Sequence, residues 1–216
     1  MKGKLEKRNF DFEIRAEDSE RGKKISGRPV VYESKTNLGP FDEVIAQGAL
    51  NKTDLRDVRF LVNHDLSKIP LASSRRNNGN STMQLFPILQ GLDFEAYLDV
   101  ERNERARELV SAIEREDLTG MSFMFSIDSE EWKDLESDHP TRRILEIGTI
   151  VEISACSFPA YDSTFINARN KEALENAELA LEKARRNYYA RKNGVDTPID
   201  TLELLKEKTK IYLGGF

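Results

Sequence analysis

Residues 120–127, Gly-Met-Ser-Phe-Met-Phe-Ser-Ile, constrain the fold of this chain more than any other segment. Large apolar side chains alternate there with polar or more flexible ones, and a period of two predicts a β-strand with one face in a core. The apolar face comprises Met121, Phe123, Phe125 and Ile127, and the opposite face comprises Ser122, Met124, Ser126 and Asp128. The chain is therefore expected to fold around a buried sheet, with Ser122 near the start of this strand.

Further strands are predicted from the same alternation, with turn residues between them. They are expected near residues 10–15, 25–32, 59–62, 69–74, 83–89, 91–100 and 144–158. Pro29 within the second of these indicates an edge strand or a bulge. One internal helix is predicted over 104–118, where apolar residues recur at helical spacing, and it is expected to end at Thr119-Gly120. Many short strands and one helix predict an α+β fold, a mainly antiparallel, closed or nearly closed β-barrel surrounded by helices.

The pattern changes after Ala168. Apolar residues at helical spacing predict a helix over 174–188, and Thr197-Pro198 resembles the start of a second helix that continues to about residue 213. Since neither helix follows from the barrel pattern, we expect a domain over residues 1–167 and a C-terminal helical appendage over 168–216. A length of 216 residues suits one domain with an appendage. The appendage is interpreted as a docked helix, a partner-binding arm or a removable segment.

Composition excludes several classes of protein. The net charge is −5, which argues against a dedicated nucleic-acid binder. No apolar run approaches the roughly 20 residues of a membrane helix, so no membrane partner is expected. The N-terminus has no apolar core typical of a secretory signal. One cysteine excludes an internal disulfide framework and fits a reducing compartment. Two histidines and no Cys/His spacing typical of zinc leave no metal or cofactor expected.

Three residues far apart in the chain could form a site: His64, Ser122 and Glu152. A serine hydroxyl becomes a good nucleophile when an imidazole takes its proton, and a third group then fixes the tautomer of that imidazole. Histidine titrates near neutrality, so His64 is the natural base. Glu152 interrupts an apolar run, where an unpaired buried carboxylate would be costly, and a histidine is a suitable partner for it.

Alternatives remain open from the residues alone. Ser122 could be an ordinary strand-edge serine, His64 a turn histidine, and Glu152 a solvent-facing residue of an edge strand. Cys156 could be the nucleophile, although it lies about 13 Å from Glu152 along an extended strand and has apolar neighbours typical of an inert thiol. His139 could replace Glu152 as the third member, although its surroundings are typical of an exposed loop.

An α/β-hydrolase is disfavoured by the residues around the serine. Met124 stands where the second glycine of a Gly-x-Ser-x-Gly elbow would be. The order His, Ser, Glu along the chain also differs from the order in that fold.

Four segments, in this order and at these separations, carry a family resemblance. They are Phe-Asp-Glu-Val-Ile-Ala-Gln-Gly-Ala-Leu at 41–50, Leu-Val-Asn-His-Asp at 61–65, Gly-Met-Ser-Phe at 120–123, and Val-Glu-Ile-Ser at 151–154 with Pro-Ala-Tyr at 159–161. Over about residues 10–167 the chain resembles the prohead (procapsid) maturation proteases of tailed bacteriophages, which are related in fold to the herpesvirus assemblin proteases. This resemblance, rather than spacing, makes the three residues our preferred site.

The resemblance implies a serine endopeptidase in which Ser122 is the nucleophile, His64 the base and Glu152 the third member, where the herpesvirus relatives use a second histidine. Two departures concern the surroundings of the site and not the triad. Met124 replaces a glycine that is frequent two residues after the serine, and Leu-Ala-Ser at 71–73 stands where the family often has a glycine-arginine pair.

The resemblance also implies the setting. The enzyme would act in the host cytoplasm, inside the assembling procapsid, on scaffold protein or on a scaffold-like N-terminal segment of the major capsid protein, and then cut itself. The herpesvirus analogy suggests a homo-dimer or a higher oligomer. We interpret the tail as a packaging or inhibitory segment that is removed during maturation. The alternative is a non-catalytic capsid-assembly or scaffold-binding protein on the same fold, working through the helical tail.

Overall fold

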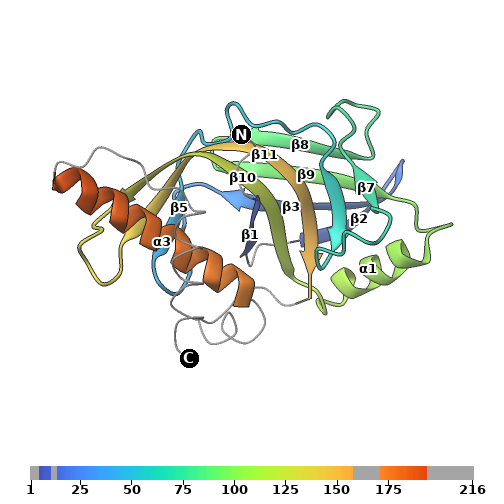
Figure 1. The fold of residues 1–216 in the computed structure, drawn as a ribbon. Helices are drawn as coiled ribbons and strands as arrows, with labels where there is room; N and C mark the ends of the chain where they lie inside the picture. The colour runs from blue at the N-terminus through green and yellow to red at the C-terminus, as the bar shows by residue number, and fades with distance from the viewer. Residues whose placement is uncertain (1–4, 11–13, 158–170, 194–216) are drawn as a thin grey trace. The chain divides into compact units, whose positions relative to one another are not determined.

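A computed structural model of the chain describes residues 5–10, 14–157 and 171–193 (Figure 1). These residues form a mixed α+β structure that is mostly sheet. The strands are β1 (Leu5–Phe10), β2 (Ile14–Ser19), β3 (Gly22–Val31), β4 (Lys35–Asn37), β5 (Asp42–Ile45), β6 (Arg59–Val62), β7 (Ala72–Ser73), β8 (Met83–Ile88), β9 (Gly91–Leu98), β10 (Gly120–Lys133) and β11 (Thr141–Cys156), and the helices are α1 (Glu104–Glu114) and α3 (Lys171–Lys192). The second predicted tail helix lies outside the described residues.

The described strands form two sheets, so the expected closed barrel is wrong. The larger sheet has seven strands in the order β1-β10-β11-β5-β4, with β6 paired to β11 and β7 paired to β6. The smaller sheet has four strands in the order β2-β3-β9-β8. Closure fails because the long strand β11 has different neighbours along its length, β5 and β6, and each of these leads to its own sheet edge. Alternation predicts which way a side chain faces, and it does not predict these neighbours.

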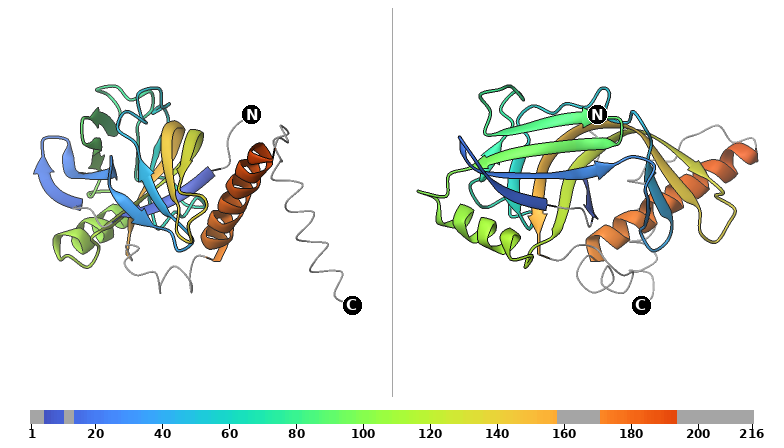
Figure 2. Two further views of the ribbon diagram at one scale, coloured as in Figure 1. Left: turned by 90° about the vertical axis from the view of Figure 1, so that its left-hand side faces the viewer. Right: turned by 180° about the vertical axis from the view of Figure 1, so that it is seen from behind.

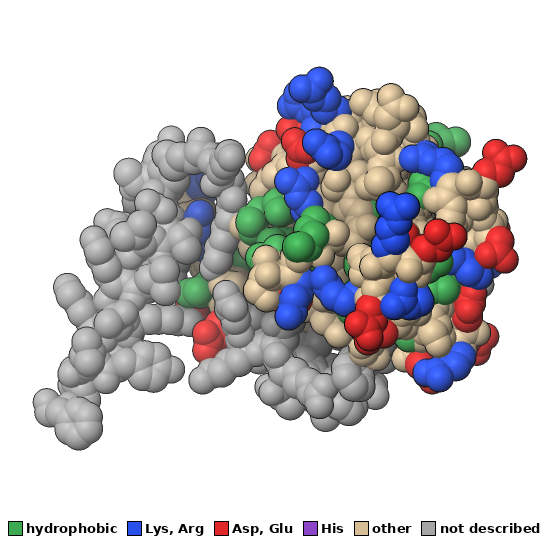
Figure 3. Space-filling view, turned by 90° about the vertical axis from the view of Figure 1, so that its right-hand side faces the viewer, with side chains coloured by type: hydrophobic (Ala, Val, Ile, Leu, Met, Phe, Trp, Pro, Cys, Tyr) green, Lys and Arg blue, Asp and Glu red, His purple; other side chains and the backbone are tan. Residues whose placement is uncertain are grey.

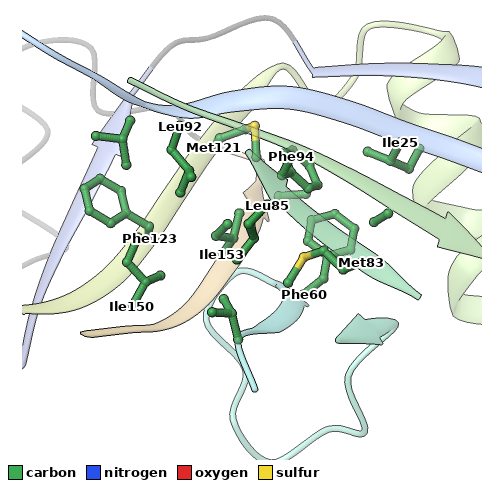
Figure 4. Close-up of a cluster of buried hydrophobic side chains, with 14 of the residues drawn as sticks. Ile25, Phe60, Met83, Leu85, Leu92, Phe94, Met121, Phe123, Ile150 and Ile153 are labelled. Atoms are coloured by element: carbon green, nitrogen blue, oxygen red, sulfur yellow. The ribbon is translucent and has the colours of Figure 1, made fainter. Parts of the chain in front are cut away.

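A shared hydrophobic core lies between strands of both sheets, as Figure 4 shows. Phe123 of β10, Ile153 of β11 and Phe60 of β6 project into it from the larger sheet, each 0 % exposed. Phe94 of β9 meets Phe60 with ring centroids 5.4 Å apart. The apolar face predicted for residues 120–127 is confirmed, because its methionine and phenylalanines all belong to this cluster.

The predicted irregularity at Pro29 is confirmed as a bulge. The β3–β9 register shifts between Gly27 and Val30, and β3 is an inner strand of the smaller sheet rather than an edge. On β9, Gly91 has a φ of +152°, and a Cβ added there would lie 1.9 Å from the carbonyl oxygen of Val30. Only glycine fits this close approach of two backbones.

Helix α1 begins as predicted and ends earlier than predicted. Asn103 caps its N-terminus, since its side chain accepts a hydrogen bond from the Ala106 N–H. The helix ends at Glu114 because Glu116 adopts a left-handed φ of 60°, so the predicted stop at Gly120 is too late. Its apolar face packs into the core, and the helix lies beside β2 (Figures 1 and 2). The strand expected over 69–74 is likewise shorter, because only β7 forms there.

The chain divides into two compact units, of which the first comprises residues 1–34, 45–130 and 144–162. The second unit comprises residues 35–44, 131–143 and 163–216. Inside it, Phe41 packs against Trp132 with ring centroids 4.8 Å apart, and Leu181 of α3 joins their cluster. Arg185 of α3 donates to the carbonyl oxygen of Leu135 at 3.1 Å. The predicted helix over 174–188 thus exists and is docked within its own unit, whereas a boundary between domains at residue 167 stays a prediction.

A buried ion pair also belongs to the second unit. Arg142 Nη1 lies 3.3 Å from Glu43 Oε2, and the two side chains are 5 % and 3 % exposed. Elsewhere the charges are mixed, since acidic and basic side chains lie close together on the face that Figure 3 shows. Among the helices of the described residues, none is long and apolar enough to cross a membrane.

Candidate active site

Three neighbouring strands of the larger sheet carry the residues of the expected site or lead to them. In the larger sheet β10 lies next to β11, and β11 lies next to β6. Ser122 belongs to β10, Glu152 belongs to β11, and His64 follows the last residue of β6 by two positions. Residues separated widely in sequence are therefore brought to adjacent strands.

Alternation turns the polar side chains away from the core. Met121 and Phe123 lie in the core on either side of Ser122, so the serine side chain leaves the opposite face of β10. On β11, Ile153 and Ala155 lie in the same core, so Ser154 between them also leaves the opposite face. All of these side chains are fully buried, including both serines.

A side-chain hydrogen bond indicates the register between β10 and β11. The Thr149 N–H donates to Ser126 Oγ at 3.2 Å. Consecutive neighbouring strands joined by a short connection run antiparallel. Ser122 lies four residues before Ser126 on β10, and position 153 lies four residues after Thr149 on β11. Ser122 is therefore level with residues 152–154, at a distance of one strand spacing, about 4.8 Å. The serine and the carboxylate therefore occupy the same part of the sheet.

A turn places His64 against β11. Asn63 and His64 both adopt left-handed φ values, 52° and 58°, a region in which asparagine and histidine are enriched among residues other than glycine. The turn is held from both sides. The Asn63 N–H donates to Ala155 O at 2.9 Å, extending the parallel β6–β11 ladder, and Asn63 Oδ1 accepts from the Ser157 N–H at 3.1 Å. The His64 N–H donates to Ser154 Oγ at 3.1 Å. These bonds direct the imidazole back along β11.

The imidazole of His64 meets the carboxylate of Glu152. His64 Nδ1 lies 2.6 Å from Glu152 Oε1, with the glutamate side chain 0 % exposed and the histidine 15 % exposed. Ser154 Oγ donates to the second oxygen, Oε2. A carboxylate at this depth is costly unless it is paired and hydrogen-bonded, and both requirements are met here. The interpretation of Glu152 as a solvent-facing residue is therefore wrong.

The contact with the Glu152 carboxylate fixes the tautomer of the His64 imidazole. A carboxylate accepts hydrogen bonds only, so it holds the ring proton on Nδ1 and leaves Nε2 as the acceptor. A nearby negative charge also stabilises an imidazolium.

Ser122 has a different hydrogen-bond partner. Its Oγ donates to the carbonyl oxygen of Arg8 at 2.8 Å. Arg8 belongs to β1, which pairs antiparallel with β10 and places Asn9 opposite Ser122. A predicted contact between the Ser122 hydroxyl and the His64 imidazole stays a prediction.

Cys156, the alternative nucleophile, and His139, the alternative third member, are in less suitable environments. Burial first, and then the charge of Glu152, raise the pKa of the Cys156 thiol to about 12, so it remains a thiol at neutral pH. His139 Nε2 lies 2.9 Å from Asp42 Oδ1 within the second unit, and its side chain is 40 % exposed. Burial would raise the pKa of Asp42, but hydrogen bonds from His139 and Lys35 lower it overall. The geometry favours Ser122 over the thiol and Glu152 over His139.

Sequence reasoning missed two residues that position the site. Ser154 links the Glu152 carboxylate to the His64 backbone, and Asn63 ties the histidine turn to the end of β11. The signal for Ser154 was its place two residues after Glu152, which alternation puts on the same face. Among the described residues, no group of three or more His, Cys, Asp or Glu side chains is arranged to hold a metal ion.

A buried carboxylate paired with an imidazole, beside a strand that carries a serine, is compatible with a serine hydrolase. The family comparison agrees with this class. The family model described as caudovirus prohead serine protease matches residues 10–178, and the chain belongs to this family. It is thus a serine peptidase of the phage capsid-maturation family, and the family predicted from the sequence is confirmed.

A solved structure similar to this chain is that of the bacteriophage T4 capsid assembly protease, gp21. The TM-score is 0.44 and the sequence identity 12%, over 72% of this chain and 98% of that chain. No curated protein was found to match the chain.

Proposed function

We propose that the chain is a serine endopeptidase of procapsid maturation with a Ser122–His64–Glu152 triad. Its substrates are the scaffold protein or the scaffold-like segment of the major capsid protein, and the enzyme also cleaves itself. The reaction takes place inside the assembling procapsid in the host cytoplasm. The observation that carries the proposal is the 2.6 Å contact between His64 Nδ1 and the fully buried Glu152 carboxylate, one strand away from Ser122.

The chemistry is acyl transfer. The Ser122 oxygen attacks a peptide carbonyl carbon while its proton passes to His64 Nε2, giving a tetrahedral oxyanion and an imidazolium held by Glu152. The imidazolium then protonates the leaving amine, and the C–N bond breaks to leave an ester on Ser122. Water attacks this ester with His64 again as the base, which releases the carboxyl product and restores the hydroxyl. Backbone N–H groups would stabilise the oxyanion.

The likeness in fold to the herpesvirus assemblin proteases and the association into a homo-dimer or higher oligomer belong to the same proposal. So does removal of residues 168–216 during maturation. Size-exclusion chromatography with light scattering tests the association state, and mass spectrometry of matured particles tests whether the tail persists.

Ser122→Ala tests the enzyme assignment. With wild-type chain, the phage's own scaffold and capsid precursors should be shortened, whereas with Ser122→Ala they should persist at full length. Ser126→Ala is the matched control, because Ser126 lies on the same face of β10 four positions further on, and it should process normally. Normal processing by Ser122→Ala in a folded protein would falsify the assignment.

A second candidate is a non-catalytic capsid-assembly or scaffold-binding protein. The observation that favours it is the Ser122 hydroxyl itself, which donates to the Arg8 carbonyl oxygen. The two functions differ in self-processing after expression. Shortened fragments that are absent from Ser122→Ala favour the peptidase, and indefinite stability of the full chain favours the binding protein.

A further inference from the structure

The edge strand β1 lies directly beside the proposed nucleophile in the sheet. It pairs with β10 in the register Lys7↔Met124, Arg8↔Phe123 and Asn9↔Ser122, and it is the last strand on that side of the larger sheet. The peptide bond between Arg8 and Asn9 is thereby placed beside Ser122. The carbonyl oxygen of that peptide bond is the atom to which the Ser122 hydroxyl donates, at 2.8 Å.

This hydrogen bond determines what Ser122 can do. A serine hydroxyl carries one proton and can donate it to one acceptor at a time. While the proton is directed at the Arg8 carbonyl, it is not available to an imidazole, and general-base catalysis requires that transfer. The paired state of β1 is therefore a resting state of the site.

The position of β1 is also that of an extended peptide at a sheet edge. Without β1, the N–H and C=O groups of β10 beside Ser122 would form an open edge, which accepts an added strand through backbone hydrogen bonds. Such an edge holds a peptide by its backbone and presents its carbonyl groups in a fixed order along the strand. A segment held there in the register of β1 has one carbonyl group against the serine.

Side-chain contacts of Arg8 help to hold β1 at this edge. Arg8 is buried, lies over the Phe125 ring at 5.6 Å and pairs with Glu6. Leu5, in contrast, is 44 % exposed at the start of the strand. A short edge strand, paired on one side only, can be replaced by another strand more readily than an inner strand of the sheet.

We infer that the β10 edge beside Ser122 is the substrate-docking edge, that its ligand is an extended peptide segment of the substrate running antiparallel to β10, and that β1 occupies this edge as an intramolecular substitute. Catalysis on another chain requires β1 to leave. This inference rests on the proposed peptidase function and adds where and in which direction the substrate binds.

A reversible crosslink in the full chain tests it. Leu5 and Ser126 are directly paired, a placement that suits a disulfide after Leu5→Cys and Ser126→Cys. Cys156 does not compete, because its thiol is buried. The readout is the rate at which a fluorophosphonate probe labels Ser122, located by mass spectrometry, together with cleavage of an extended reporter peptide. Ser126→Cys alone, under the same oxidant, is the matched control.

Oxidation should lower both rates at least about tenfold, because the rate follows the fraction of molecules in which the edge is open. Reduction should restore them. A second full-chain variant, Lys7→Pro with Arg8→Pro, should act in the opposite direction. Adjacent N–H groups point to opposite sides of a strand, so one of the two prolines must remove a hydrogen bond to β10. Lys2→Pro, before β1, is its control.

The outcomes separate the two proposals. If oxidised and reduced forms label and cleave equally, or if the proline variant is slower than wild type while it remains folded, the inference is overturned and the peptidase function stands. If neither wild type nor any variant is labelled at Ser122 or cleaves peptide, the peptidase function itself fails. A crosslink that slows the reaction, reversed by reductant, supports the docking edge even if the proline variant does not fold.

Discussion

Replacing Glu152 by glutamine changes one oxygen of a fully buried carboxylate into an NH2 group and leaves the shape of the side chain nearly unchanged. The amide can be oriented in two ways. In the first, its oxygen accepts from Ser154 Oγ and its NH2 faces His64 Nδ1. In the second, its oxygen faces Nδ1 and its NH2 faces Ser154. The hydrogen bonds of the wild-type site decide between them.

The first orientation keeps every hydrogen bond, because Ser154 still donates to an oxygen and still accepts from the His64 N–H. The second leaves the buried Ser154 proton to find another acceptor, at a cost of about 1–3 kcal/mol. The first therefore dominates, and in it Nδ1 is an acceptor, so that the ring proton moves to Nε2. The nitrogen that should take the Ser122 proton is then blocked, and kcat should fall by about 10³–10⁴-fold.

Ser154→Ala tests this reasoning in the same background. Without the Ser154 hydroxyl no hydrogen bond favours the first orientation, so the amide oxygen can face Nδ1 and molecules of the double variant can keep the correct tautomer. The double variant loses the charge of the carboxylate and also the Ser154 acceptor of the His64 N–H. A hydrogen bond to a charged group contributes about 1.5–3 kcal/mol, so the double variant should be about 10–150-fold below wild type and more active than Glu152→Gln alone. Steady-state cleavage of a scaffold-derived peptide measures all three. His139→Ala is the comparison for the alternative third member and should retain nearly full activity. A double variant no faster than Glu152→Gln, or a larger loss with His139→Ala, would refute the argument.

Three further predictions concern stability. Gly91→Ala would place a Cβ 1.9 Å from a backbone carbonyl oxygen of β3, so it should lower the free energy of unfolding by about 2–4 kcal/mol in urea titrations, with kcat of the folded fraction unchanged. Arg142→Met removes the buried ion pair with Glu43 and should lower the free energy of unfolding, whereas adding Glu43→Leu should restore part of it, as thermal unfolding would show. The hydrogen bond from Arg56 lowers the pKa of Asp54 from 3.8 to about 2. A lowered carboxyl pKa stabilises the fold above pH 4 and loses that effect as the pH falls through 2, so Asp54→Asn should cost about 0.5 kcal/mol at pH 7 and progressively less as the pH approaches 2.

The sequence predicted the facing of side chains well, for a physical reason. Burial of one face requires alternation, so the order of residues along the strand was enough to assign Phe123 and Ser122 to opposite sides of it. The same argument applied to Glu152, because a carboxylate inside an apolar run needs a partner and the chain contains only two histidines. The pairing of His64 with Glu152 follows from chemistry that sequence displays.

The neighbours of each strand could not be predicted in the same way. Backbone hydrogen bonds join β1 to β10 and β6 to β11, and these bonds are the same whatever the side chains are. For this reason the two-sheet architecture and the pairing of β1 beside Ser122 were both missed. A turn at His64 was among the alternatives from the sequence, whereas the hydrogen bonds that hold this turn against β11 could not be predicted.

The parallel pairing of β6 with β11 has a consequence for when the chain can react. His64 and Glu152 are 88 positions apart in sequence, and contacts between such distant segments form late in folding because a long loop must close first. A chain that has folded only in part has a serine without a correctly held base. Under the proposed function, competence to cut would arise only with the completed sheet, so the chain would not cut its assembly partners during its own synthesis.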